Sequence, residues 1–159
     1  MGIDIAAQVR RSYEELWHQG NLDFIDENCT PDFVAHDAFA GDVDREGLKG
    51  IVQLFRGAFP DIRFRLHEVL VSGNCATVRW SALGTHSGQL LDIAPTGHRV
   101  EVQGIGLVHF EGDMESEHWE MWDVMGLMQQ LNAAPVIGVP TSVHPPPPGR
   151  AAPRSEVRH

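Results

Sequence analysis

The residues best suited to chemistry lie together late in the chain, in the stretch Glu115-Ser116-Glu117-His118-Trp119-Glu120-Met121-Trp122-Asp123. Alternate side chains of an extended strand share one face, so His118, Glu120 and Trp122 point to the same side. If that side faces an apolar pocket, the loss of hydration would make Glu120 a proton carrier near neutral pH, and His118 could polarise or relay the proton. Alternatively, both side chains pair with neighbouring strands at a wet surface and have no further role.

Two glycines, Gly104 and Gly106, share one face of the strand predicted just before this stretch. Because glycine leaves space above a strand, a ligand could lie against the backbone there. A bulge or a bend in the strand is the alternative explanation.

Aromatic residues and one histidine complete the candidate pocket. Large rings such as Trp17 and Trp80 are usually core residues, and pocket lining is the second interpretation. His36 precedes a small stretch, Asp37 to Gly41, that suits a pocket mouth, although an ordinary surface position is the alternative. The candidate substrate-binding residues are Trp17, His36, Phe39, Phe55, Phe59, Trp80, Gly104, Gly106 and Trp122.

The pattern of apolar residues predicts helices first and strands afterwards. Helical spacing covers residues 5–17 and 45–59, Asn21 can cap a short helix between them, and 32–36 reads as a short strand. After Pro60 the period becomes alternating, which predicts strands at 62–72, 76–86, 99–110 and 114–124, followed by a helical turn or two at 124–131. This order favours an α+β fold in which an antiparallel sheet curls over its helices.

One domain, residues 1–132, accounts for the patterned part of the chain. Residues 133–159 contain the run Pro145 to Pro148 and few large apolar groups, so we expect a flexible or extended tail there. The alternative for the proline run is a ligand for a proline-recognising domain.

The composition excludes several classes of partner. With 12 basic and 22 acidic residues the formal charge is −10, so nucleic acid and anionic lipid surfaces would be repelled. No run of about 18 apolar residues predicts a membrane span. The two cysteines are not spaced as a metal or disulfide framework, and no metal-binding or dinucleotide motif is present. We therefore expect a cytoplasmic protein with no metal and no cofactor.

Five segments, taken in order, carry a family resemblance: Tyr13-Glu14-Glu15-Leu16-Trp17-His18-Gln19-Gly20-Asn21, Pro31-Asp32-Phe33-Val34-Ala35-His36-Asp37, Phe59-Pro60-Asp61, Ala94-Pro95-Thr96-Gly97, and Glu117 to Asp123 continuing to Leu131. The ordered set runs from about Val9 to Asn132. It resembles the SnoaL-like polyketide cyclase (predicted ester cyclase) family of the nuclear transport factor two-like superfamily.

The resemblance implies a cone-shaped α+β barrel, in which a curved antiparallel sheet wraps over three N-terminal helices around an internal pocket. It also implies a homodimer through the outer face of the sheet. Well-known members close a ring by intramolecular aldol condensation without metal or cofactor, using an aspartate as acid/base and a histidine on the preceding strand. The aspartate matches Glu120, and the histidine falls at or near Gly106. A polar contact falls at Ala35 or His36, and a ring from the first helix falls at Trp17.

Our first hypothesis is a cofactor-independent cyclase or isomerase acting on an apolar, polyketide-like substrate, helped by the geometry in which the pocket holds it. Glu120 would move the proton, with His118 and His36 assisting. The alternative is a non-catalytic module for ligand binding or dimerisation on the same fold. A third hypothesis, epoxide hydrolysis, would need Arg79, Glu120 and Asp123 to converge, although alternation places the two carboxylates on opposite faces.

Overall fold

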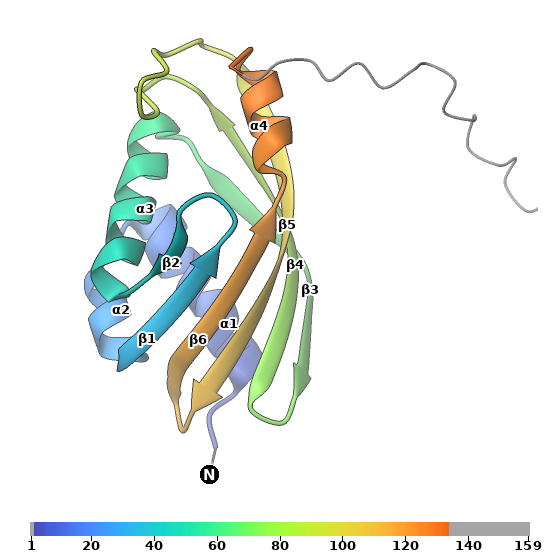
Figure 1. Ribbon diagram of the computed structural model, residues 1–159. Helices are drawn as coiled ribbons and strands as arrows, with labels where there is room; N and C mark the ends of the chain where they lie inside the picture. The colour runs from blue at the N-terminus through green and yellow to red at the C-terminus, as the bar shows by residue number, and fades with distance from the viewer. Residues whose placement is uncertain (1, 134–159) are drawn as a thin grey trace, which may run out of the picture.

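The computed structural model describes residues 2–133, which form helices packed inside a curved sheet (Figure 1). The helices are α1 (Ile5–Tyr13), the π-helical turn η1 (Glu14–Gln19), α2 (Asp23–Asn28), α3 (Arg45–Ala58) and α4 (Val124–Gln130). The strands are β1 (Cys29–Asp37), β2 (Gly41–Val43), β3 (Arg63–Ser72), β4 (Cys75–Thr85), β5 (Arg99–Glu111) and β6 (Met114–Trp122).

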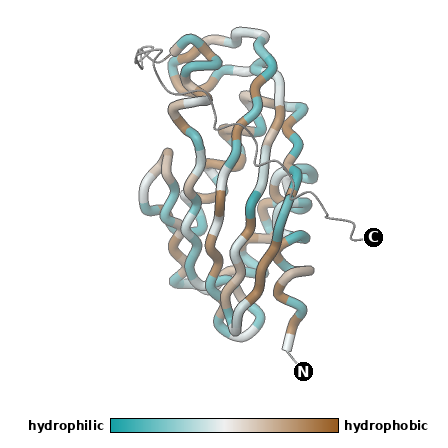
Figure 2. Tube along the Cα trace, turned by 90° about the vertical axis from the view of Figure 1, so that its right-hand side faces the viewer, coloured by the Kyte–Doolittle hydropathy of each residue, from teal (hydrophilic) through white to brown (hydrophobic). Residues whose placement is uncertain are grey.

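The strands form one unclosed sheet in the order β2-β1-β6-β5-β4-β3. Three antiparallel pairings join β3 to β6, as the alternating pattern after Pro60 predicts. The sheet is nevertheless mixed, because β1 lies parallel to β6 on its other side. Hydrophobic and hydrophilic residues alternate along much of the long strands (Figure 2). Because successive side chains of a strand point to opposite faces, the sheet has an apolar inner face and a more polar outer face.

Side-chain caps fix where the helices begin. The Asp4 carboxylate accepts from the Ala7 amide at the start of α1, and Asp44 accepts from Gly47 at the start of α3. Asp123 accepts from Gly126 in the same way and begins α4 directly after β6. Such caps each stabilise a helix by about 1 kcal/mol.

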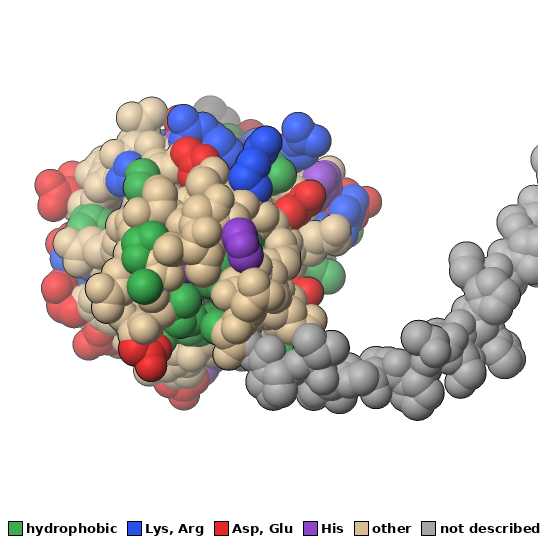
Figure 3. Space-filling model, turned by 90° about the horizontal axis from the view of Figure 1, so that it is seen from above, with side chains coloured by type: hydrophobic (Ala, Val, Ile, Leu, Met, Phe, Trp, Pro, Cys, Tyr) green, Lys and Arg blue, Asp and Glu red, His purple; other side chains and the backbone are tan. Residues whose placement is uncertain are grey.

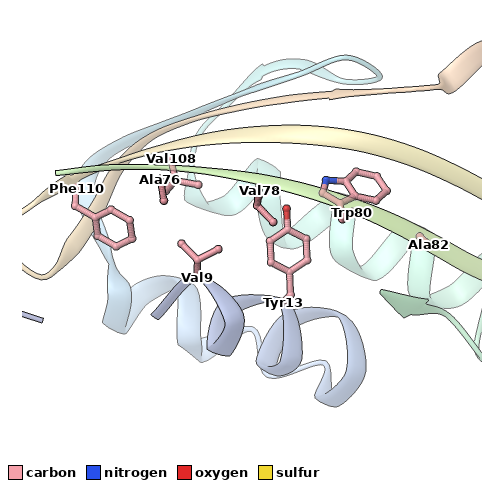
Figure 4. Packing of buried hydrophobic residues seen from close by; sticks show 8 residues of the cluster. All are labelled: Val9, Tyr13, Ala76, Val78, Trp80, Ala82, Val108 and Phe110. Carbon is pink, nitrogen blue, oxygen red and sulfur yellow. The ribbon is translucent and has the colours of Figure 1, made fainter. Parts of the chain in front are cut away.

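The hydrophobic core lies between the helices and the inner face of the sheet. In Figure 4, Val9 and Tyr13 of α1 rise towards Val78 and Trp80 of β4, and all four are buried. Burial of a large apolar side chain contributes about 1.5–3 kcal/mol, so this contact anchors α1 across the sheet.

The structure confirms the predicted α+β fold and corrects three details. The first strand is longer than 32–36, and the short strand β2 had no alternating pattern to reveal it. Asn21 does not cap α2, because its amide donates to the Glu15 carboxylate. Gly20 ends η1, with a φ of 69° that favours glycine.

Residues 2–133 contain no helix that is long and apolar enough to cross a membrane. The tail expected at 133–159 falls outside the described residues, apart from Ala133.

Candidate active site

A largely apolar pocket of about 110 Å³ lies between the inner face of the sheet and the helices. Residues of α1, η1, α2 and α3 form most of its helical side, and residues of β1, β3, β4, β5 and β6 form its sheet side. The polar residues that line it are Ser12, Tyr13, Asp37, Glu115, His118 and Glu120, together with the indoles of Trp17, Trp80 and Trp122. Figure 3 shows the molecule from above relative to Figure 1, with hydrophobic side chains towards the middle of this surface and charged ones mostly around its edge.

The carboxylate of Glu120 is the centre of the polar network in the pocket. Trp80 donates its indole N–H to Glu120 Oε1 at 2.6 Å, and Tyr13 donates its hydroxyl to Oε2 at 3.2 Å. His118 Nε2 lies 2.7 Å from the same Oε2. In Figure 4 the Tyr13 hydroxyl points up to the sheet beside Trp80, so α1 and β4 bring these two hydrogen-bond donors close together.

Burial and charge act in opposite directions on His118. Burial acts to lower the pKa of its imidazole, but the hydrogen bond and charge of Glu120, with the charges of Glu115 and Asp37, outweigh it and raise the pKa. Burial, and then Glu120, raise the pKa of Tyr13 well above its ordinary value. At neutral pH, therefore, Tyr13 is a phenol that donates a hydrogen bond, and His118 holds a proton more tightly than a free imidazole.

The two glycines of β5 make room for protein side chains rather than for a ligand. A Cβ atom at Gly106 would lie 2.9 Å from Glu120 Oε2 and 3.1 Å from His118 Nε2. A Cβ atom at Gly104 would lie 2.3 Å from the Trp80 ring. The prediction of open space above these glycines is therefore wrong, because His118, Glu120 and Trp80 occupy it.

The family resemblance places a histidine at or near Gly106, where this chain has no side chain. In the structure an imidazole nevertheless lies at that place, because it comes from the neighbouring strand. His118 reaches from β6 into the space above Gly106, whose register partner is Glu120. The carboxylate and the imidazole thus come from one strand, two residues apart, and the bare glycine on the neighbouring strand allows them to meet.

A β-bulge adds Glu115 to the inner face. In the register of β5 with β6, His109 pairs with Glu117 and Phe110 with Glu115, so Ser116 is an extra residue. The bulge reverses the alternation, and Glu115 lines the pocket together with His118 and Glu120. Strict alternation from Glu120 would place Glu115 on the opposite face, and for this reason the sequence pattern misses it.

Asp37 and Tyr13 are further pocket residues that the sequence pattern did not single out. Asp37 Oδ2 accepts from the Trp122 indole at 3.3 Å, and its Oδ1 accepts from the amides of Phe39 and Ala40. The only sequence signal for Tyr13 was its place on the apolar face of the first helix. A contact between residues 107 positions apart, such as Tyr13 with Glu120, has no local signature.

Most of the predicted site residues lie together. His118, Glu120, Trp17, Phe55, Phe59, Trp80 and Trp122 all line the pocket. Phe39 packs behind it on Phe55 and Trp122, and is not a lining residue.

His36 lies on the other face of the sheet, so its assignment to the pocket is wrong. Its ring bonds to Asp42 and Glu117 and stacks on Trp119, while the preceding residue, Ala35, lines the pocket.

The arrangement needed for epoxide hydrolysis is not formed. Arg79 pairs with Glu68 on the exposed outer face, and Asp123 caps α4. Neither residue lines the pocket that holds Glu120.

Comparison with known proteins agrees with this architecture. The family model described as SnoaL-like polyketide cyclase matches residues 7–131. No curated protein matched the chain. Among solved structures, a protein from Acidithiobacillus ferrooxidans is 28% identical, with a TM-score of 0.71, over 84% of this chain and 100% of its own.

Two further structures are similar. IdmH from Streptomyces antibioticus is 26% identical, with a TM-score of 0.69, over 80% of this chain and 98% of its own. A Jannaschia protein at 24% identity, over 80% of this chain and 90% of its own, has a TM-score of 0.72 and shows the fold alone. The first two carry the name "putative polyketide cyclase", and the third carries the name "putative SnoaL-like polyketide cyclase". Because the family model covers most of the sequence, and the fold and pocket agree with it, this chain belongs to the SnoaL-like polyketide cyclase family.

Proposed function

We propose that this protein is a cofactor-independent cyclase or isomerase that closes or rearranges a ring in an apolar, polyketide-type small molecule. The observation that carries the proposal is the Glu120 carboxylate, which lies inside an apolar pocket in contact with the His118 imidazole. Glu120 and His118 are the proton-transfer pair in this proposal, and the rings of Trp17, Trp80 and Trp122 shape the substrate.

The hydrogen bonds of Glu120 support a role in proton transfer. A carboxylate has about four lone-pair directions. Tyr13, Trp80 and His118 use three of them, so roughly one direction remains for a proton of the substrate. The three contacts also hold the carboxylate in one orientation, which lowers the entropic cost of reaching a reactive geometry.

The environment makes the pair effective. Few polar groups compete inside an apolar pocket, so the hydrogen bonds that Glu120 and His118 make with a substrate would be stronger than in water. Aldol closure and a double-bond shift use such a pair most directly, whereas ether formation and cycloaddition depend more on the shape of the pocket.

Hydrogen–deuterium exchange tests the proposal without knowledge of the natural substrate. The probe is 2-tetralone, an apolar bicyclic ketone whose acidic C–H bonds exchange with D₂O, followed by NMR. The wild-type protein should accelerate this exchange, and Glu120→Gln and His118→Gln should lower the accelerated rate by about a hundredfold or more. The matched control is Glu117→Gln on the outer face of the same strand, which should leave the rate unchanged.

Two results would count against the proposal. Unchanged exchange in Glu120→Gln would exclude this carboxylate as the proton carrier. If the wild-type protein bound 2-tetralone but never accelerated exchange, the alternative of a non-catalytic ligand-binding module would be favoured.

We also propose that the protein is a homodimer formed through the outer face of the sheet. Ile105 and Met121 are register partners there, with exposed fractions of 51% and 56%. Leu107 and Trp119 form the next pair on that face. An apolar row across neighbouring strands suits a second copy of the same surface, because a two-fold axis brings identical patches together.

A further inference from the structure

Among the described residues, Glu115 is a buried carboxyl of the pocket that the proposed proton transfer does not use. Glu115 is only 5% exposed and lines the pocket, yet its Oε1 has no hydrogen-bond partner among the described residues. An unpaired buried carboxyl costs stability, and such a group in a native structure calls for an explanation.

The backbone places Glu115 on the inner face at one end of β6. The extra residue Ser116 reverses the alternation, so Glu115 shares the inner face with Glu120. Opposite these two residues on β5 are Phe110 and Gly106, which are four positions apart. At about 3.3 Å per residue the two backbone positions are roughly 13 Å apart.

We propose that Glu115 forms a hydrogen-bonding subsite at the buried end of the pocket, where its carboxyl binds a hydroxyl or carbonyl oxygen of the substrate. The inference deepens the proposed function, on which it rests. It specifies an apolar substrate with an oxygen atom at the end that lies beside Glu115. The carbon that meets Glu120 would lie further along the substrate, because the two backbone positions are roughly 13 Å apart.

The surroundings of Glu115 fit this role. Burial raises the pKa of the Glu115 carboxyl. The charge of His118 acts in the opposite direction, and the smaller effect of the Glu120 charge adds to the rise. A neutral carboxyl both donates and accepts a hydrogen bond, so it can bind an alcohol or a ketone. Its neighbour across the parallel pairing is Cys29, a buried thiol that also lines the pocket. Within residues 2–133, no Lys or Arg lines the pocket, so a neutral oxygen fits better than an anion.

The test compares naphthalene with 2-naphthol, which share one ring system and differ by a hydroxyl. Quenching of tryptophan fluorescence reports binding, because Trp17, Trp80 and Trp122 line the pocket. The wild-type protein should bind 2-naphthol about 3- to 10-fold more tightly, the range expected for one hydrogen bond. Glu115→Gln should keep the preference, because an amide also donates and accepts, and Glu115→Leu should lose it.

Two control variants separate this inference from the proposed function. Glu117→Leu, on the outer face of the same strand, should keep the preference for 2-naphthol. Glu120→Gln should also keep it while losing the exchange activity. A preference lost in Glu120→Gln but retained in Glu115→Leu would overturn the subsite and leave the proposed function intact. Equal binding of the two probes by the wild-type protein would also overturn the subsite.

A stability measurement is independent of any ligand. If Glu115 is kept for binding rather than for folding, replacing it with leucine removes an unpaired buried group, and Tm should rise by a few degrees. A fall in Tm would identify Glu115 as a structural residue and overturn the inference.

Discussion

At the scale of single residues, position 106 shows how one missing side chain sets the chemistry of the site. His118 and Glu120 are two residues apart on β6, and their 2.7 Å contact lies directly above Gly106. Any Cβ atom there would meet both polar groups and Val78 within 3.2 Å. The glycine is therefore required by the side chains of the neighbouring strand, whereas its own backbone conformation does not require it.

Gly106→Ala tests this requirement. We expect the methyl group to displace the His118–Glu120 pair and to lower exchange of 2-tetralone by roughly tenfold, because a small misplacement of catalytic groups is costly. The measurement is the exchange rate by NMR, with Tm recorded alongside.

Gly50→Ala is the matched glycine control. A Cβ atom at Gly50 on α3 would meet nothing within 4 Å, so this variant should keep full activity and gain about 0.5–1 kcal/mol of stability. Full activity in Gly106→Ala would show that the pair does not depend on that space.

At the scale of elements, the inner and outer faces of β6 have separate tasks. His118, Glu120 and the bulge-shifted Glu115 face the pocket, and Glu117 faces outward to His36 of β1. His36 also contacts Asp42 of β2, so one imidazole joins three strands at the edge of the sheet. The hydrogen bonds to Glu117 and then to Asp42 raise the pKa of His36 above its ordinary value of 6.5.

This contact predicts a pH-dependent stability. The folded state raises the pKa of His36, so its protonated form stabilises the fold below pH 6.5, and that contribution is lost as the pH rises through the raised pKa. The difference in Tm between the wild type and His36→Gln should therefore be larger at about pH 6 than at about pH 9. A constant difference across that interval would contradict a charged bridge between β1, β2 and β6.

At the scale of the whole molecule, the sheet separates the pocket from an exposed apolar patch on its outer face. The helices fill the concave side and leave the pocket, whereas Ile105, Leu107 and Met121 remain exposed on the convex side. The formal charge of −10 keeps copies apart in general, so association would depend on local complementarity at this face.

A charge placed in the middle of the outer face tests the dimer. Met121→Asp would bring two carboxylates and their desolvation cost into a two-fold interface, so we expect a monomer in light scattering coupled to size-exclusion chromatography. Glu111→Asp, a conservative change at the exposed end of β5, should leave the oligomeric state unchanged. A wild-type protein that is monomeric at micromolar concentration would contradict the dimer.

The sequence by itself determined most of the elements and one half of the site. Periodicity placed α1, α3 and the strands β3 to β6 within a few residues, because an amphipathic pattern must turn its apolar side to a core. Alternation along β6 also predicted that His118, Glu120 and Trp122 share a face, as they do in the pocket.

Only the tertiary structure decided what surrounds those residues. The contacts of Glu120 with Tyr13 and Trp80 join segments far apart in the chain, and the parallel pairing of β1 with β6 joins its two ends. The bulge at Ser116 reverses a face without any pattern in the sequence. Periodicity is a local property, whereas register and long-range contacts depend on how all the elements pack together.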